Sequence, residues 1–276
     1  MTLVATNITV DYDIGGRRGV RALDDVSLAV APGESVAVMG VSGSGKSTLG
    51  LVLCGVLAAQ AGSVSGSARV AMALQRPESA LFGETVAEDV AFVATLEGLA
   101  GSEVDRRVEW ALDAVGLDAS FARRDPFALS GGEQRRVAIA GVLAAGPDVV
   151  ILDEPTAGLD AYARNTLIAR LASLGEHGVA LVVITHESRD AARLCERLVV
   201  LDAGRIVHDG PTVDVLGSLP RTVALGLEPL TAVAAVDVAA HRRGVRPPTT
   251  IDETELVAFL ATVARDTQER GSAWVQ

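Results

Sequence analysis

The 276-residue chain contains few cysteines, few aromatic residues and a single lysine. Its two cysteines, Cys54 and Cys195, are too few for a disulfide framework at this length, so we expect two small buried side chains in a reducing compartment. Aromatic residues make up only 3% of the chain, whereas apolar residues make up 49% and charged residues 21%. This composition is typical of a globular protein and excludes a disordered one. The length allows one large domain or a domain with an appendage.

Basic residues are fewer than acidic ones, 24 against 35, which gives a net charge of −11. Non-specific binding of nucleic acid needs a basic surface, so no nucleic-acid partner is expected. The uncharged stretch 47–68 is long enough to span a bilayer, but it contains several serines and four glycines. We expect a short buried helix followed by a turn there, and no membrane span. Residues 1–7 have no basic start and no long apolar stretch, so no signal peptide is expected either.

The single lysine, Lys46, lies in a motif whose chemistry calls for an ammonium group. Residues 40–47 match G-x-x-x-x-G-K-[ST], between an apolar run of strand type (35–39) and a predicted helix (46 to about 57). Glycines allow backbone N–H groups to face phosphates, and the helix N-terminus adds partial positive charge. We therefore expect this phosphate loop to bind a nucleotide, with the Ser47 hydroxyl on Mg²⁺. The predicted nucleotide contacts are Gly40, Val41, Ser42, Gly43, Ser44, Gly45, Lys46, Ser47 and Thr48.

Apolar periodicity predicts strands that alternate with helices, and hence a mainly parallel sheet covered by helices. The predicted strands are 2–12, 23–30, 35–39, 149–152 and 180–185, with a loop at 15–19 and a hairpin over 198–207 that turns at 202–204. Segments 76–145 and 161–174 have helical patterns, and loops are predicted at 123–126 and 129–132. Beyond residue 216, prolines separate short predicted helices, which indicates a small C-terminal appendage.

Two carboxylates follow the predicted strand 149–152. A buried parallel strand delivers the residues after it to the sheet edge where ligands bind. Asp153 is therefore expected to hold Mg²⁺ through water, and Glu154 to orient or deprotonate the water that attacks the γ-phosphate. A phosphate loop with such a carboxylate strand fits kinases, GTPases, helicases and transporters alike.

The segment Leu129-Ser-Gly-Gly-Glu-Gln134 separates these classes, because it resembles the signature of the ATP-binding cassette (ABC) family. The resemblance implies an α/β fold with a P-loop core, an antiparallel β subdomain and an inserted helical subdomain at about 76–145. It places an ATPase domain at 2–220 and an appendage at 221–276. It also implies that Ser130, Gly131, Gly132 and Glu133 cap ATP bound by a second subunit, either another copy or a paralogue. Taken alone, the segment also fits an ordinary N-capped helix.

Four more positions match the family in order and spacing. The resemblance implies that Tyr12 stacks on adenine, although ordinary surface packing would also explain an aromatic residue there. Gln75 would contact Mg²⁺ and sense the membrane partner. Asp160 would lie across the dimer interface, and His186 would contact the γ-phosphate. With ATP and Mg²⁺ bound, the catalytic residues would be Glu154, His186, Lys46 and, from the other subunit, Ser130.

Residues 75–92 and the tail 225–260 resemble one branch of the family, the ATPases of energy-coupling factor (ECF) transporters and of cobalt and nickel importers. That branch implies ATP-driven import of a vitamin or a transition-metal ion at the cytoplasmic face of the membrane. Its partners would be a transmembrane T component and a substrate-binding membrane subunit. The alternatives are another transporter branch, a soluble ABC protein acting on ribosomes or DNA, and a cassette that binds ATP without cleaving it.

The segment 77–105 has no basic residue but seven acidic ones: Glu78, Glu84, Glu88, Asp89, Glu97, Glu103 and Asp105. Like charges repel one another, so a cluster of seven acidic residues calls for a structural or functional explanation. One interpretation is a solvated helix face. The other is an acidic groove that receives a basic helix of the membrane partner.

Overall fold

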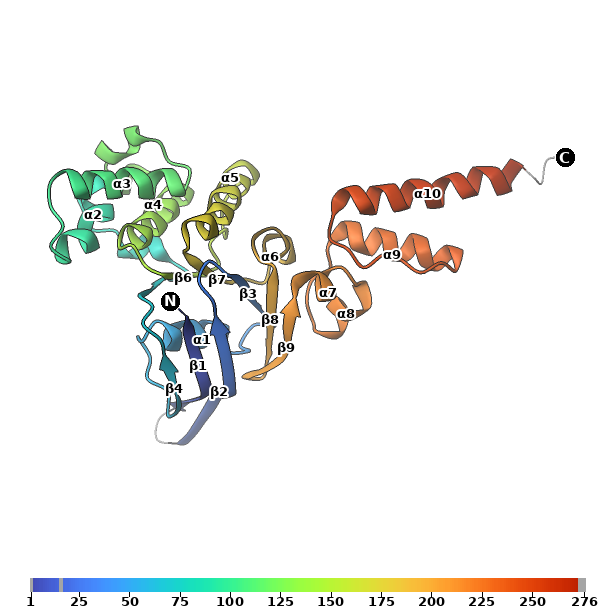
Figure 1. The fold of residues 1–276 in the computed structure, drawn as a ribbon, viewed down its shortest axis with the longest axis horizontal. Coiled ribbons are helices and arrows are strands. Elements are labelled where there is room, and N and C mark those ends of the chain that lie inside the picture. Colours follow the sequence, from blue (N-terminus) through green and yellow to red (C-terminus); the bar gives the residue numbers. More distant parts are fainter. Residues whose placement is uncertain (1, 15–16, 273–276) are drawn as a thin grey trace.

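The computed structural model describes residues 2–14 and 17–272. Figure 1 shows a body built around two sheets, with a group of helices (α2, α3 and α4) on one side and the helices α9 and α10 projecting on the other. This arrangement agrees with the predicted α/β fold class, which includes a helical part and a C-terminal appendage.

The larger sheet has the strand order β5-β6-β7-β3-β8-β9. Five strands are parallel, and β9 runs antiparallel to β8. The predicted hairpin is confirmed, because Ala203 and Gly204 turn between these two strands with positive φ. The strands are β3 (Ser35–Met39), β5 (Val70–Ala73), β6 (Val149–Asp153), β7 (Ala180–Ile184), β8 (Arg197–Asp202) and β9 (Arg205–Pro211).

Both faces of this sheet are covered, which explains the continuous apolar runs in its central strands. Leu152 and Val150 pack with the helices α5 (Ala161–Ala172) and α6 (Ser188–Leu194). Ile151 and Val149 face the other way, toward α1 (Lys46–Leu53) and the smaller sheet. The predicted helix from 46 to about 57 ends earlier, at Leu53.

The smaller sheet is antiparallel, with the order β2-β1-β4. Its strands are β1 (Leu3–Ile14), β2 (Arg17–Val30) and β4 (Ala61–Ser65), and Gly15 and Gly16 of the predicted loop lie outside the described residues. The short helix and the turn expected within 47–68 are present, as α1 and a turn at 54–55, but strand β4 in the same stretch was not predicted. Its small residues carry little strand propensity, so the pairing with β1 creates the strand. Gly62 has φ +86°, and a Cβ there would lie 2.4 Å from the carbonyl oxygen of Asn7.

The helical part consists of α2 (Val86–Leu96), α3 (Ser102–Ala114) and α4 (Gly131–Ala144), with short 3₁₀ turns at 77–80, 119–123 and 126–128. The three helices pack on one another through the buried side chains Val90, Leu112 and Val137. The predicted loop 129–132 is shorter than expected, because Gly131 and Gly132 already belong to the first turn of α4.

The chain after β9 forms α7 (Thr212–Leu216), α8 (Leu219–Ala224), α9 (Thr231–Arg243) and α10 (Glu253–Ser272), and α7 precedes the predicted appendage at 221–276. Val233, Val236 and Leu256 form a small core between α9 and α10. The expectation of short helices is wrong for α10, which has 20 residues. Within the described ranges, no helix combines the length and the apolar character that crossing a bilayer requires.

Candidate active site

The phosphate loop connects β3 to α1 and depends on glycines in left-handed conformations. Gly40, Gly43 and Gly45 have φ of 141°, 81° and 105°. A Cβ on Gly45 would lie 2.3 Å from the carbonyl oxygen of Ala22, and a Cβ on Gly40 would lie 2.1 Å from that of Leu201. Only glycine combines these torsions with such close packing.

The polar groups of the loop fit a phosphate ligand. Lys46 Nζ donates to the carbonyl oxygens of Gly40 and Val41, each at 2.9 Å. Burial lowers the pKa of Lys46, against the opposing effect of Glu154 and Asp153. The hydroxyl of Ser44 is buried, and it has no hydrogen-bond partner among the described residues. The loop therefore holds an ammonium group and an unsatisfied hydroxyl that phosphate oxygens can engage.

Tyr12 lies beside this loop although it comes from β1. Its hydroxyl is 3.3 Å from Oγ1 of Thr48. The two residues line a cavity of about 280 Å³ together with Val20, Ala22, Gly43, Gly45, Lys46 and Ser47. The fold thus brings an exposed aromatic ring to the phosphate loop, which is the position required for the predicted stacking on adenine.

Asp153 ends β6 next to Ser47. Burial raises the pKa of the Asp153 carboxyl group, while a hydrogen bond from Ser47 acts in the opposite direction. Across the described part of the chain, no group of three or more His, Cys, Asp or Glu side chains could hold a metal ion. Mg²⁺ in proteins usually keeps several water ligands and binds through one or two carboxylates together with phosphate oxygens.

Glu154 is buried and held on several sides. Its Oε1 accepts hydrogen bonds from Nδ1 of His186 at 2.7 Å and from the backbone N–H of His186 at 3.1 Å. Its Oε2 accepts from the hydroxyl of Thr185 at 3.1 Å. The hydrogen bond to Glu154 raises the pKa of His186. The two residues that sequence analysis proposed for water activation and γ-phosphate contact are thus direct neighbours, at the carboxyl ends of β6 and β7.

Ser130 caps α4 in a reciprocal capping box with Glu133. The Ser130 hydroxyl donates to Oε2 of Glu133 at 2.7 Å, and the same oxygen accepts from the Ser130 N–H at 2.9 Å. These bonds lower the pKa of Glu133. A Cβ on Gly131 would meet no atom within 4 Å, so packing inside this chain gives no reason for glycine at that position.

The predicted site residues fall into two separate groups. Ser130, Gly131, Gly132, Glu133 and Asp160 line a cavity of about 590 Å³ that shares no lining residue with the cavity at the phosphate loop. Asp160 also caps α5, where it accepts from the N–H of Ala163. The described part of the chain therefore holds the predicted site residues in two separate places.

Arg135, one turn beyond Ser130 on α4, was not singled out from the sequence. Its side chain is only 9% exposed. It donates to the carbonyl oxygen of Glu154 at 2.8 Å and to that of Gln75 at 3.0 Å. An arginine in an amphipathic helical pattern is normally expected on the solvent-exposed face. The sequence therefore gives no sign that Arg135 is buried.

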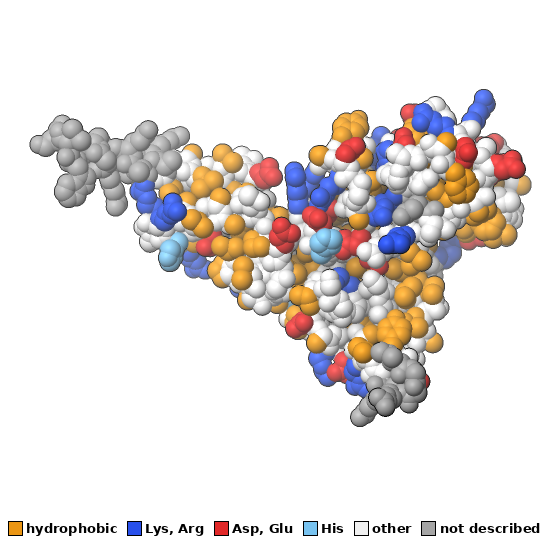
Figure 2. Space-filling model, turned by 180° about the vertical axis from the view of Figure 1, so that it is seen from behind, with side chains coloured by type: hydrophobic (Ala, Val, Ile, Leu, Met, Phe, Trp, Pro, Cys, Tyr) orange, Lys and Arg blue, Asp and Glu red, His pale blue; other side chains and the backbone are white. Residues whose placement is uncertain are grey.

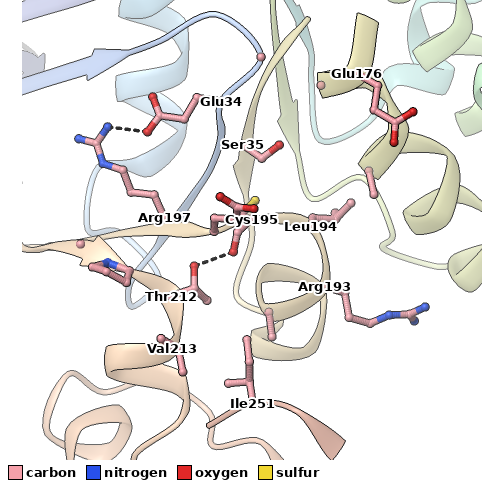
Figure 3. A pocket seen from close by; sticks show the side chains of 17 residues that line it. Glu34, Ser35, Glu176, Arg193, Leu194, Cys195, Arg197, Thr212, Val213 and Ile251 are labelled. Carbon is pink, nitrogen blue, oxygen red and sulfur yellow. Dashed lines mark hydrogen bonds and ion pairs between the residues drawn. The ribbon is translucent and has the colours of Figure 1, made fainter. Parts of the chain in front are cut away.

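A larger cavity, of about 830 Å³, lies at the other edge of the sheet, near the starts of β3 and β8 (Figure 3). Glu34 and Arg197 form an ion pair at 3.0 Å on one side of it, and Thr212 donates to the carbonyl oxygen of Cys195 at 2.7 Å. Burial raises the pKa of the Cys195 thiol, which disfavours the reactive thiolate form. As expected, Cys195 is buried, whereas Cys54 is only half-buried. Cavity size does not identify the site here, because ligands of such sheets bind at the carboxyl edge.

Comparison with known proteins gives a consistent set of relatives. The family model described as "ABC transporter" matches residues 23–157. The energy-coupling factor transporter ATP-binding protein EcfA2 of Symbiobacterium thermophilum is 38% identical over 278 residues, which cover 95% of this chain and 96% of that protein. The cobalt import ATP-binding protein CbiO of Rhodobacter capsulatus is 41% identical over 262 residues, 90% of this chain and 91% of that protein.

Solved structures agree with these relatives. CbiO1 of Clostridium perfringens, part of the ABC transporter complex CbiONQ, superposes with a TM-score of 0.71 at 27% identity, over 88% of this chain and 96% of that one. A dimeric ATP-binding cassette in a post-hydrolysis state, bound to ADP and phosphate, superposes with a TM-score of 0.69 at 28% identity, over 76% of this chain and 98% of that one.

Proposed function

The chain belongs to the ATP-binding proteins of ABC transporters, and from this premise we propose that it is the ATPase subunit of an ECF-type importer. This proposal is supported by the sequence identity to proteins named EcfA2 and CbiO, 38% and 41%, and by the fact that each alignment covers at least 90% of this chain. The resemblance of segments 75–92 and 225–260 to that branch points the same way. The subunit would act at the cytoplasmic face of a membrane and drive import of a vitamin or a transition-metal ion.

The observation that carries the ATPase assignment is the pairing of Glu154 with His186 at the sheet edge where the phosphate loop lies. In the proposed site, the loop amides and Lys46 bind the phosphates, and Tyr12 stacks on adenine. Glu154 orients the attacking water and accepts its proton, while His186 supports the γ-phosphate.

The residues proposed to bind Mg²⁺ have suitable oxygen donors and lie close to the phosphate loop. Ser47 and Asp153 already share a hydrogen bond beside the loop, and Gln75 follows β5, the strand next to β6. Oxygen donors of this kind are the ligands that Mg²⁺ prefers. When bound, the ion would neutralise phosphate charge.

We assign the second half-site to ATP held by another cassette. Ser130 begins a helix whose N-terminus favours an anion, and Gly131 leaves open space beside it. Both half-sites are present in this chain, so two copies arranged head to tail would build two complete sites. Asp160 would lie at the same interface, because it lines the same cavity as Ser130.

We propose that the membrane partner binds the surface formed by α2 and the loop before it, which we call the α2 surface. Phe82 and Phe92 are exposed there and stack edge to face, with ring centroids 4.6 Å apart. Leu96, on the same helix, is 71% exposed. Exposed apolar side chains that gather in this way mark a site of interaction. Figure 2 shows hydrophobic side chains exposed over the helical part, at the upper right of that view.

Most carboxylates of the acidic run 77–105 already have roles within this chain, so few of them are available to bind a basic partner. Asp89 is buried and accepts from the N–H of Phe82, and Glu88 accepts from the N–H of Glu84. Glu97 pairs with Arg69 at 3.3 Å. Glu103 and Asp105 lie in the first turn of α3, where the helix dipole favours acidic residues. The Glu78 side chain lies outside the described part of the structure. Glu84 is thus the exposed carboxylate best placed to meet a basic partner helix.

Affinity capture from detergent-solubilised membranes tests the proposed branch. A tagged chain, captured with ATP present, should bring down a multi-span T component and a small substrate-binding membrane subunit, both identified by mass spectrometry. Recovery of a permease of another ABC class would overturn the ECF assignment and leave the ATPase in place. Recovery of ribosomal proteins, or of DNA in a salt-dependent manner, would overturn the transport function itself.

A further inference from the structure

Arg135 joins the two segments of the site that carry water activation and metal binding. It lies on α4, the helix that Ser130 begins, and it crosses to the carboxyl edge of the larger sheet. Its Nη1 donates to the Glu154 carbonyl at 2.8 Å, and its Nη2 donates to the Gln75 carbonyl at 3.0 Å. The side chain is nine-tenths buried, so water cannot easily replace these bonds.

The backbone of Glu154 has a particular need for such a restraint. Its φ is +51°, in the left-handed region that residues with a Cβ rarely adopt. The N–H of Glu154 is held by the carbonyl oxygen of Ile184 at 2.8 Å, and its carbonyl is held by Arg135. The two peptide groups that flank the Glu154 Cα are therefore fixed from opposite sides, and this determines where the carboxylate points.

We infer that Arg135 is a positioning residue for ATP hydrolysis, which acts by fixing the backbone of Glu154 and tying it to Gln75. The inference rests on the role proposed above for Glu154. Arginine suits this task because its planar fork reaches two carbonyl oxygens at once, whereas glutamine and lysine offer no such fork.

A neighbouring helix offers a matched control. Arg107, on α3, donates to the carbonyl oxygen of Ala144 at 3.3 Å, at the opposite end of α4. Arg107→Gln removes a guanidinium–carbonyl bond of the same kind without touching Glu154, Gln75 or the phosphate loop.

The test compares Arg135→Gln, Arg135→Lys and Arg107→Gln in steady-state ATP hydrolysis, with fluorescent-ATP binding and thermal unfolding measured in parallel. Arg135→Gln should lower kcat by about 10- to 100-fold, because small displacements of a catalytic group are costly, and should change ATP affinity by less than about twofold. Arg135→Lys should recover part of the lost rate. Arg107→Gln should hydrolyse ATP like the unmodified chain.

A second arm separates positioning from general damage. If Arg135 acts through Glu154, adding Arg135→Gln to Glu154→Gln should not lower single-turnover hydrolysis any further. Unchanged kcat in Arg135→Gln would overturn the inference, and so would an equal additional loss in the Glu154→Gln background. Normal turnover in Glu154→Gln alone would instead refute the proposed role of Glu154.

Discussion

Nδ1 of His186 lies 2.7 Å from Oε1 of Glu154, and this contact joins the carboxyl ends of two adjacent parallel strands, β6 and β7. The pair is built by the sheet itself, since Glu154 directly follows β6 and His186 lies two residues after the end of β7. It places a carboxylate and an imidazole close enough to the phosphate loop for Lys46 to act on both electrostatically. The roles proposed for both residues can therefore be tested separately from nucleotide binding.

Glu154→Gln should bind ATP but barely hydrolyse it, because the amide keeps the shape of the side chain and loses the proton acceptor. We expect turnover to fall by at least about 100-fold, in line with loss of a general base. In ATP, the variant should persist as a dimer that light scattering detects. Rapid phosphate release by this variant would remove Glu154 from its proposed role.

His186 should stay protonated to a higher pH than an ordinary histidine, because its hydrogen bond to Glu154 raises its pKa above 6.5. The contact therefore adds stability that is complete at pH values below 6.5 and is lost as pH rises through the higher folded pKa. Since the imidazole is largely exposed, this contribution is small.

NMR titration of the histidine ring protons measures this directly, and the chain has only four histidines to assign. In Glu154→Gln the pKa of His186 should move back toward 6.5. An unchanged midpoint in that variant would show that the hydrogen bond is not what shifts the titration.

Gly45→Ala should damage both the fold of the phosphate loop and ATP binding. The added Cβ would meet the carbonyl oxygen of Ala22 at 2.3 Å, at a φ of +105°. We expect a loss of about 1–3 kcal/mol in the free energy of unfolding, measured by denaturant titration. Gly98→Ala is the control, because Gly98 has φ +88° and open space around its Cβ position, in the turn after α2. It should lose less stability and bind ATP normally.

Glu84→Lys should weaken assembly with the membrane partner while nucleotide binding stays intact. Reversal of Glu88 as well would also remove the hydrogen bond that its carboxylate accepts from the N–H of Glu84. Glu84→Lys alone is therefore the cleaner variant, and Glu109→Lys on α3 is its control. Equal co-purification of both variants with the partner would rule out electrostatic docking at the α2 surface.

The sequence predicts much of the core, because its strands are buried on both faces. Strands of this kind produce short, continuous apolar runs such as residues 149–152. The phosphate loop is predicted for a related reason: its glycines and lysine are required by local geometry and charge. Glu154 and His186 follow such strands, so their meeting at one sheet edge can be derived before the structure is known.

Other features depend on contacts between distant segments and leave no local pattern. Strand β4 exists through its pairing with β1, and its own residues are small and polar. Arg135 resembles a surface residue until the fold brings Gln75 and Glu154 to it. The separation of Ser130 from the phosphate loop is a property of the assembled subdomains, and the signature motif implies it only through its family resemblance.

The central claim is that ATP is hydrolysed at a site that Ser130 of a second cassette completes. The most direct test mixes two variants that should each be inactive alone, Glu154→Gln and Ser130→Glu, and measures single-turnover hydrolysis. A mixed dimer pairs the intact Glu154 of one chain with the intact Ser130 of the other. With random pairing in a 1:1 mixture, about a quarter of all sites should be complete. No recovery, in a mixture that native mass spectrometry shows to contain mixed dimers, or full activity of Ser130→Glu alone, would contradict the account.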